Sequence, residues 1–483
     1  MNYFYFDESI EYPTIAPYHP ESLYDEYPFS DDEIAAMPNN VYSSIRNMFV
    51  NMELDKDNIG TKCWNPLRSY IRPGQTVLLK PNLVNHKNPT EKDFKKGMDC
   101  LITHPSLVRC IFDYVVIALQ GKGRVIIADA PIQDCDFDCL LSATGYGKLF
   151  DYFKEKTTDN LEILTADLRA VTYRREGKKV VQSERNDMMF PGVNVDLGEA
   201  SCFSNDKNCN KVRITNYDGS DTVSSHIEGK NVYSLSAAVL EADVIISLPK
   251  PKTHRIAGYT AALKNFIGVN ARKEYLPHHK IGSAESGGDE YSGDHRFMKW
   301  INSRSNDLRN HAVKCGHENR AIFYDEIGRK TGKKLDKYNK NRYKFGMWHG
   351  NDTIWRTIID VNHAVLFADK EGEIKDKPQR RIINIGDMIV CGEKEGPLRP
   401  SYKKLGGVLF SENAVEFDMF VVKIMGFDWK KIPVLKHASL DSKLGAFTGN
   451  IVIYSNDKRF SGNLDEINEN YGFKPTSGWE GHI

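Results

Sequence analysis

One pattern constrains the fold of this 483-residue chain more than any other feature: short apolar segments with an amphipathic segment between them. Residues 74–82 and 124–131 show the pattern of buried strands, and the apolar residues between them, at 106–119, recur with helical spacing. Residues 242–250 carry the clearest strand pattern in the chain. Because strand, helix and strand follow one another, the sequence predicts an α/β fold with a parallel, Rossmann-like sheet as its core.

Changes in composition divide the chain into four predicted parts. Residues 1–74, rich in Tyr, Pro, Asp and Glu, are interpreted as a peripheral N-terminal extension with one helix around 31–51. Residues 75–270 hold the α/β core. Residues 271–375 begin with a strongly polar stretch and are interpreted as an insertion or lid, and residues 376–483 as a second α/β part that completes the site.

Weaker periodic patterns add further elements to the prediction. The sequence favours a strand at 381–390, a loop with Gly396-Pro397 at 392–405, and helices at 233–240, 351–366 and 413–426. The sequence contains no internal repeat and no low-complexity tract, so we expect no repeated structural unit.

The charge balance and the cysteines narrow the class of protein. Lys+Arg and Asp+Glu both number 65, and because nucleic-acid-binding proteins normally carry a basic excess, we expect no nucleic-acid partner. No apolar window approaches the ~18 residues of a membrane span, and the acidic, aromatic residues 1–8 do not resemble a signal peptide. The nine cysteines are dispersed like reduced thiols, so the sequence predicts a cytoplasmic protein, with its oligomeric state open.

Polar residues gather after the strand at 242–250. Lys252 and His254 follow it directly, and Lys264-Asn265 and His278-His279 come later. Ligands bind beyond the carboxyl ends of parallel strands, where a histidine serves as acid, base or metal ligand and a lysine as nucleophile, base or anion clamp. The alternative interpretation, solvated surface lysines and a loop histidine, has about equal weight.

A second group of polar residues follows the two earlier strands. Lys80 and Asn82 could bind a phosphate or carboxylate, and Asp129 could orient His104 as an acid or base. The alternative is a strand terminated by proline, followed by a helix capped near Thr103. Either interpretation fits the spacing.

Two further groups carry weaker signals. A loop could present carboxylates to a cation or a proton, although turn chemistry is the stronger interpretation of Asp387, Glu393 and Asp418. The start of the helix at 351–366 could bind an anion, and helix capping is the equal alternative for Asn351, Asp352 and Arg356.

Taken in order, these motifs resemble the family known as "domain of unknown function 362". The matching pieces lie at 77–82, 103–105 and 128–131, at 242–254, and at 258–268, where Gly258-Tyr259-Thr260 precedes Lys264-Asn265. Asp387, Glu393 with Gly396-Pro397, and residues 418–426 complete the set, which spans roughly residues 75–435. The resemblance implies that Thr260 also belongs to the substrate-binding residues. Many members carry an iron–sulfur module, but this sequence lacks the cysteine spacing for it, so no ferredoxin-type cluster is expected.

A more distant similarity is to the nickel-pincer lactate racemases. Lys264 follows His254 by ten residues, and a histidine follows 14 or 15 residues later. The similarity implies a lysine that anchors a cofactor, histidines that act as acid and base, and a histidine that binds metal. On that basis a divalent metal is a possible cofactor, with candidate ligands Asp129, His278, His279, Asp387 and Glu393.

We therefore expect an enzyme that acts on a small anionic substrate such as a hydroxy acid, a sugar acid or a phosphorylated sugar. The reaction would be racemisation or epimerisation, or a step in surface-polysaccharide biosynthesis. The second setting is what a resemblance implies, because the polar stretch 271–350 and the segment 350–356 look like a subgroup of the family found among surface-polysaccharide gene sets. His254, Lys264, His104 and Lys252 are its candidate catalytic residues. The alternatives are a non-catalytic protein that binds a metal or cofactor, and a structural partner in a polysaccharide-synthesis assembly.

Overall fold

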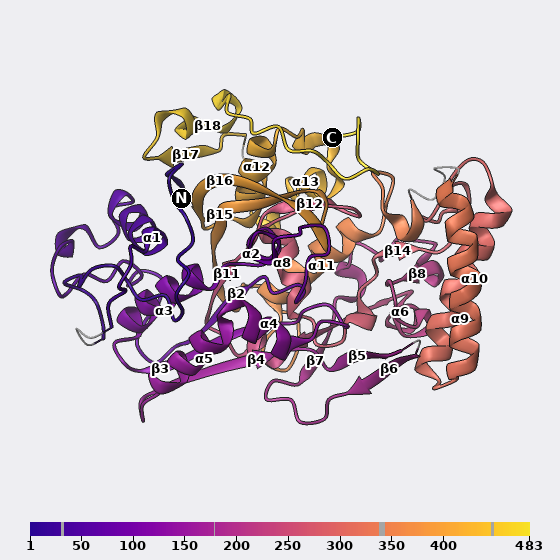
Figure 1. Ribbon diagram of the computed structural model, residues 1–483, viewed down its shortest axis with the longest axis horizontal. Coiled ribbons are helices and arrows are strands. Elements are labelled where there is room, and N and C mark those ends of the chain that lie inside the picture. The colour runs from indigo at the N-terminus through magenta and orange to yellow at the C-terminus, as the bar shows by residue number, and fades with distance from the viewer. Residues whose placement is uncertain (30–32, 178, 338–342, 446–448) are drawn as a thin grey trace.

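An eleven-stranded sheet organises the part of the chain that this computed structural model describes, residues 1–29, 33–177, 179–337, 343–445 and 449–483. Helices cover both faces of this sheet, which confirms the predicted α/β fold (Figure 1). The other described strands form small sheets of two or three strands. No helix among the described residues is long and apolar enough to cross a bilayer.

Five adjacent strands form the parallel core of the large sheet. In spatial order they are β15 (Arg381–Glu395), β11 (Val244–Leu248), β2 (Thr76–Pro81), β3 (Gly123–Asp129) and β4 (Leu161–Asp167). The predicted helix between β2 and β3 is α3 (Pro105–Leu119). Because β2, β3 and β11 run parallel, their carboxyl ends meet at one edge of the sheet.

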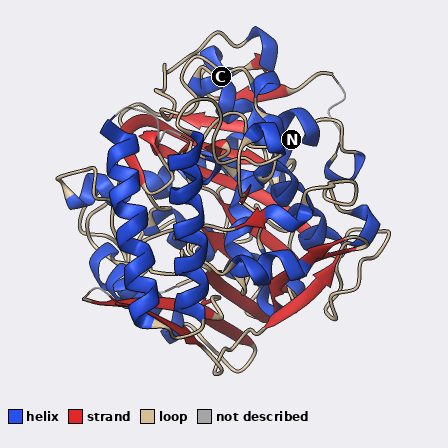
Figure 2. Ribbon diagram, turned by 90° about the vertical axis from the view of Figure 1, so that its right-hand side faces the viewer, coloured by secondary structure: helices blue, strands red, loops and turns tan. Residues whose placement is uncertain are grey.

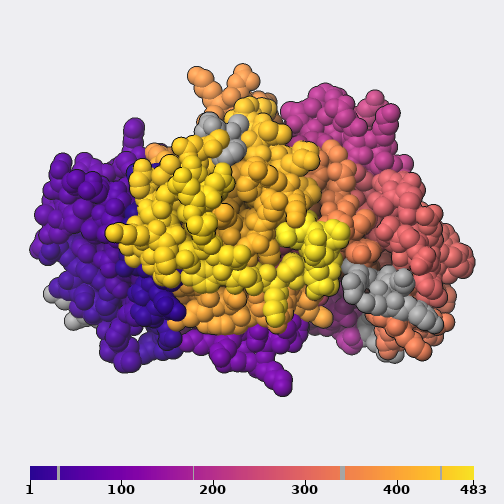
Figure 3. Space-filling view, turned by 90° about the horizontal axis from the view of Figure 1, so that it is seen from above, coloured from indigo at the N-terminus to yellow at the C-terminus, as the bar shows by residue number. Residues whose placement is uncertain are grey.

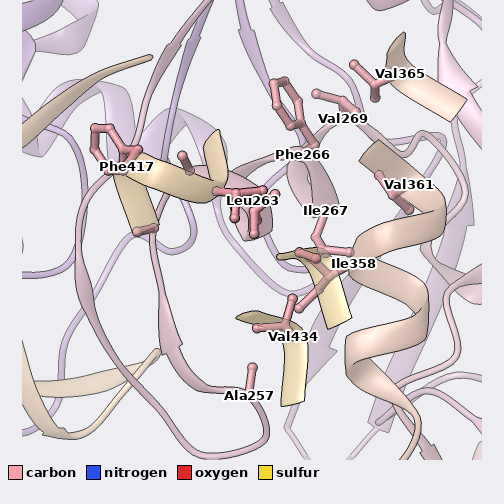
Figure 4. Packing of buried hydrophobic residues seen from close by; sticks show 14 of the residues in the cluster. Ala257, Leu263, Phe266, Ile267, Val269, Ile358, Val361, Val365, Phe417 and Val434 are labelled. Carbon is pink, nitrogen blue, oxygen red and sulfur yellow. The ribbon is translucent and has the colours of Figure 1, made fainter. Parts of the chain in front are cut away.

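Side chains of the core strands alternate between two hydrophobic cores, one on each face. Leu78, Ile126 and Ile245 belong to one core, whereas the adjacent Leu79 and Ile246 belong to the other. The first core packs against α8 (Ala262–Asn265), α11 (Ile354–Phe367) and α12 (Ala414–Met425), as Figure 4 shows for Leu263, Ile358 and Phe417. The second packs against α3, α1 (Asn40–Asn51) and α5 (Tyr146–Glu155).

Residues 2–6, which the sequence assigned to a peripheral extension, form strand β1 (Asn2–Phe6) inside the large sheet. This strand pairs antiparallel with β16 (Arg399–Ser411) and parallel with β17 (Val452–Ser455). Phe4 is fully buried and contacts the rings of Phe420 and Phe460. Burial of this aromatic segment explains why it joins the sheet instead of lying at the periphery.

Two predicted elements are wrong. Residues 233–240 were expected to be helical, but β10 (Lys230–Ser236) is a strand and only α7 (Ala237–Leu240) is helix. The loop expected at 392–405 is a β-hairpin, since β15 and β16 pair out to Glu395 and Arg399 and only three residues form the turn. Its outer end is polar on both strands, and this hid the alternating pattern of a buried strand.

The polar segment after residue 271 folds into a hairpin of two long helices, α9 (Arg296–Lys314) and α10 (Glu318–Lys337). The two helices lie side by side at one end of the molecule (Figures 1 and 2), and Figure 3 shows this part of the chain at the same end, seen from above. They pack against the small sheet of β5 (Val171–Glu176) and β6 (Lys179–Glu184). Other small elements are β7 (Gly192–Asp196), β8 (Val212–Arg213), β9 (His226–Ile227), β14 (His279–Lys280), β18 (Gly462–Asn463), α2 (Phe94–Asp99), α4 (Phe137–Thr144), α6 (Gly219–Ser225) and α13 (Pro433–Ala438).

Candidate functional site

A cavity of about 520 Å³ lies at the carboxyl ends of the parallel strands, beside the turn between β15 and β16. It has the size of a small-molecule site. Eight of the residues that the sequence singled out line it: Asn82, Asp129, Lys252, His254, Thr260, Lys264, Asn265 and His278. The structure therefore gathers most of the first group, and part of the second, around one space.

A buried ion pair between Lys80 and Asp129 forms the floor of this cavity. Lys80 Nζ lies 2.7 Å from Asp129 Oδ1 and donates to Pro81 O at 2.8 Å and to Asn265 Oδ1 at 3.3 Å. Asp129 Oδ2 accepts from the amide of Leu83 at 2.5 Å. Each charge of the pair has its counter-charge inside the protein. Because Lys80 lies on β2 and Asp129 on β3, the pair joins the ends of these strands, and the hydrogen bond from Lys80 holds Asn265 in place.

Gly268 has no side chain, which allows Asp129 and Lys80 to pack closely against its backbone. A Cβ at this position would lie 2.3 Å from Asp129 Oδ1 and 3.0 Å from Lys80 Nζ. We expect Gly268→Ala to lower the free energy of unfolding by roughly 1–3 kcal/mol, measured by urea denaturation, because it overpacks a rigid region. Gly147→Ala in α5, where the nearest atom is the Leu141 carbonyl oxygen at 3.3 Å, is the control and should lower the free energy of unfolding by less than Gly268→Ala does. Equal stability of Gly268→Ala and wild type would contradict this account.

Lys252 points its ammonium group toward neutral partners. It lies on β12 (Lys252–His254), which pairs antiparallel with β13 (Gly258–Thr260). Its Nζ donates to Asn82 Oδ1 at 3.0 Å and to the carbonyl of Leu101. Burial, and then the charge of Lys250, lower the pKa of Lys252 to about 7. This amine is therefore close to half-charged at neutral pH.

Lys264 and Lys273 bring two more amines to the cavity wall. Burial and the neighbouring Lys273 lower the pKa of Lys264 to about 7, and burial lowers that of Lys273 to about 8. Within the described residues, neither Nζ has a hydrogen-bond or ion-pair partner. Two buried amines that face a cavity without a carboxylate partner of their own are a costly arrangement, and a bound anion would relieve it.

The ring of His254 is held in one tautomer. Its Nδ1 accepts hydrogen bonds from the amides of Ile256 at 3.0 Å and Ala257 at 3.1 Å. Burial, followed by the charge of Lys264, keeps its pKa well below the ordinary value, so the ring is neutral. Because Nδ1 accepts, the proton is assigned to Nε2. His254 therefore offers the cavity a hydrogen-bond donor, and the role of base does not suit it.

His278 is held in the opposite tautomer. Its Nδ1 lies 2.9 Å from the carbonyl of Leu276 and must donate to it, so Nε2 keeps a free lone pair. Burial and then Lys264 lower the pKa of His278 to about 3. The two neutral rings give the cavity one donor and one acceptor.

The cavity wall carries an excess of positive charge. Three carboxylates line it, and two of these are already paired: Asp129 with Lys80, and Glu395 with Arg255. Six cationic residues line the wall: Lys87, Lys252, Arg255, Lys264, Lys273 and Arg399. The sequence motifs indicated only Lys252 and Lys264 as site residues, because Lys273 and Arg399 fall outside the residues of those motifs.

His104 lies outside the cavity lining and has a structural environment. It caps α3, where its Nδ1 accepts from the amide of Ser106 at 3.2 Å, and its ring stacks on Tyr12 with a centroid distance of 4.0 Å. Asp387 pairs with Lys250 at 2.8 Å and accepts from the hydroxyl of Tyr12. The two residues thus belong to a buried network separate from the cavity, which favours the capping interpretation.

The remaining candidates are also occupied elsewhere. Asn351 accepts from the amides of Thr353 and Ile354 at the start of α11, and Asp352 pairs with Arg356 at 3.0 Å. These contacts favour helix capping over anion binding. Asp418 accepts from the amides of Ala262 and Leu263 and so fixes the start of α8.

The five predicted metal ligands do not converge. His279 lies 3.3 Å from Glu290, and Glu393 accepts from the amide of Lys474. Asp129 and Asp387 are paired with different lysines. Within the part of the chain that the structure describes, no group of three or more His, Cys, Asp or Glu side chains is placed to hold a metal ion. The side chains present therefore do not fit the proposed ligand set.

Residues 474–479, which we call the C-terminal strap, support one wall of the cavity. The amides of Lys474 and Ser477 donate to Glu393 and Glu395. The indole of Trp479 donates to the carbonyl of Arg255 at 2.9 Å, and its ring packs on Gly258 so closely that a Cβ there would lie 3.0 Å away. No sequence motif indicated this support, because the strap is more than 200 residues from Arg255.

The fold and the site define an α/β protein with a cationic cavity at the carboxyl edge of a largely parallel sheet. The chain belongs to the family described as "Domain of unknown function (DUF362)", whose sequence model matches residues 169–423. The match includes β12, Lys264 and the β15–β16 turn, and it excludes Lys80, Asp129 and the strap. No curated protein and no solved structure gave a significant match.

Proposed function

We propose that the cavity binds a small hydroxylated anion and that the protein is an enzyme acting on it. The observation that carries this proposal is the pair of buried amines, Lys264 and Lys273, which face the cavity without a carboxylate partner among the described residues. A carboxylate or phosphate would take that place. His254 Nε2–H and the His278 Nε2 lone pair together suit a hydroxyl group, which both donates and accepts. Hydroxy acids, sugar acids and phosphorylated sugars have this chemistry.

Proton transfer is the reaction that these groups support best. An amine whose pKa lies near 7 is an efficient base or acid at neutral pH. In the fraction of complexes in which Lys264 is neutral, its amine would accept a proton from the carbon next to the substrate carboxylate, and the charged Lys252 and Lys273 would stabilise the enolate that forms. Return of this proton from Lys264 regenerates the substrate, whereas delivery of a proton from charged Lys252 to the opposite face of the carbon would give the epimer and leave Lys264 charged and Lys252 neutral. This is racemase- or epimerase-like chemistry, and such a step also suits the assembly of surface polysaccharides.

A second candidate function is the non-catalytic binding of a phosphorylated cofactor. The volume of about 520 Å³ favours it, because the cavity is large enough for more than a three-carbon acid. The two functions differ in turnover. Incubation of the protein with each anion in D₂O, followed by NMR, would show deuterium incorporation at carbon only for the enzyme.

Anion affinity should fall as pH rises. Lys252 and Lys264 have pKa values of about 7 in the free protein, and a bound anion favours their charged forms, so binding takes up protons above pH 7. We expect affinity for glycerate, gluconate or glucose 1-phosphate, whichever binds best, to fall at least about tenfold between pH 7 and pH 9. Isothermal titration calorimetry in two buffers of different ionisation enthalpy measures both effects. Affinity that stays constant across this range would contradict the proposed role of the lysines.

A further inference from the structure

The outer face of the α9–α10 hairpin is a surface that no other described part of the chain covers. Figure 2 shows both helices in full view in front of the rest of the molecule. Their inner sides pack on each other and against the small β5–β6 sheet. The outward residues, by contrast, repeat every three or four positions along each helix and so form one stripe per helix.

Large hydrophobic side chains occupy these outward stripes. Phe297 is 74% exposed and stacks on Trp300, which is 47% exposed, with a centroid distance of 6.0 Å. Leu308 continues the stripe of α9 and is 45% exposed, and Phe323 on α10 is 59% exposed. Isolated exposed apolar residues are ordinary, but four on one helical hairpin indicate a surface that meets an apolar phase.

The same hairpin carries a strong positive charge. Residues 296–337 contain eleven Lys and Arg against five Asp and Glu, an excess of six, whereas the whole chain is balanced at 65 and 65. Arg304 lies between the apolar residues of the α9 stripe, and Lys330 and Lys334 follow Phe323 on α10. All three cations are solvent-exposed. Apolar side chains and cations are therefore interleaved on one face.

We propose that this face docks on a membrane surface rich in anionic lipids. Trp, Phe and Leu side chains insert at the boundary between headgroups and acyl chains, and nearby Lys and Arg side chains attract anionic headgroups. The charge complementarity selects this occupant over a second copy of the chain, because two copies of the face would bring cations against cations. The hairpin lies flat on the membrane and does not span it.

Vesicle sedimentation of the full-length chain tests this proposal. We expect binding to vesicles of phosphatidylcholine with 30% phosphatidylserine at 0.1 M NaCl. Binding should be at least about tenfold weaker to pure phosphatidylcholine and at 0.5 M NaCl, since salt screens the attraction. The charge variant Lys330→Glu with Lys334→Glu should lose at least about tenfold in affinity. The apolar variant Phe297→Ser with Trp300→Ser should lose a similar amount.

Matched controls lie on other exposed parts of the surface. Leu440→Ser removes a side chain that is 80% exposed outside the hairpin, and Lys62→Glu reverses an exposed charge there; both should bind vesicles like wild type. An unchanged thermal melting curve shows that each variant folds. Three results would overturn the proposal: vesicle binding that the hairpin variants leave intact, retention by a polynucleotide with no binding to vesicles, or a dimer that the apolar variant dissociates.

Discussion

Replacing Lys264 with Met is expected to remove anion binding and, at the same time, to stabilise the folded protein. The amine is buried, and among the described residues it has no partner, so it contributes to ligand binding and not to folding. Loss of the proposed proton-transfer group should lower turnover by about 10²–10⁴-fold. The folded protein should gain on the order of 3 kcal/mol at pH 7, because the pKa of this lysine falls from 10.5 in the unfolded chain to about 7 in the fold.

The stability gained by Lys264→Met depends on pH, because Lys264 binds its proton more weakly in the folded protein than in the unfolded chain. Between about pH 7 and 10.5 the unfolded chain binds more protons at this lysine than the folded protein does, so the contribution of Lys264 to stability rises with pH. The advantage of the Met variant should therefore be largest at pH 7 and below, and it should disappear near pH 10.5. Urea denaturation at pH 6, 8 and 10 measures it. Lys87→Met, at an exposed lysine of the same cavity, is the control and should leave stability unchanged. A destabilised Lys264→Met protein would show that the amine has a structural role.

Removing the carboxylate of Asp129 should give the largest loss of stability in the site. Asp129→Ala leaves Lys80, which is fully buried, without a counter-charge. It also leaves the amide of Leu83 without its acceptor. Breaking a buried ion pair in this way costs about 3–5 kcal/mol, measured by urea denaturation.

Two further variants show how much of this loss of stability comes from the unpaired charge of Lys80. Glu241→Ala breaks an ion pair with Arg124 that is about one-third exposed, and it should cost at most about 1 kcal/mol. Lys80→Met combined with Asp129→Leu removes both charges and should recover a large part of the loss. Similar losses for Asp129→Ala and Glu241→Ala would show that the buried pair contributes no more than a surface one.

The position of the cavity could be predicted from the sequence, because ligands bind at the carboxyl ends of parallel strands. Lys252, Lys264 and Asn82 follow strands that were recognisable from their apolar runs, and parallel strands bring their carboxyl ends together. The same rule selected Lys80 and Asp129, which lie at the same edge of the sheet but pair with each other in the floor of the cavity. Spacing along a chain does not reveal whether a charged residue finds its partner within the protein.

The predictions for His104 and Asn351 show a second limit. Both side chains accept from amides at the start of a helix, and the same residue types serve as caps and as ligand-binding groups. The residues that complete the wall, such as Lys273 and Arg399, reach it through long-range packing. The β15–β16 hairpin was likewise hidden because its polar outer end departs from the pattern of a buried strand.

The C-terminal strap has a consequence for how the protein is made on the ribosome. The strap holds Arg255, Glu393 and Glu395, so the wall that these residues form lacks its support until residues 474–479 have left the exit tunnel. Strand β1 likewise cannot pair until β16 and β17 have been synthesised, about 400 residues later. The nascent chain therefore carries this wall of the cationic cavity without its support until residues 474–479 have been synthesised.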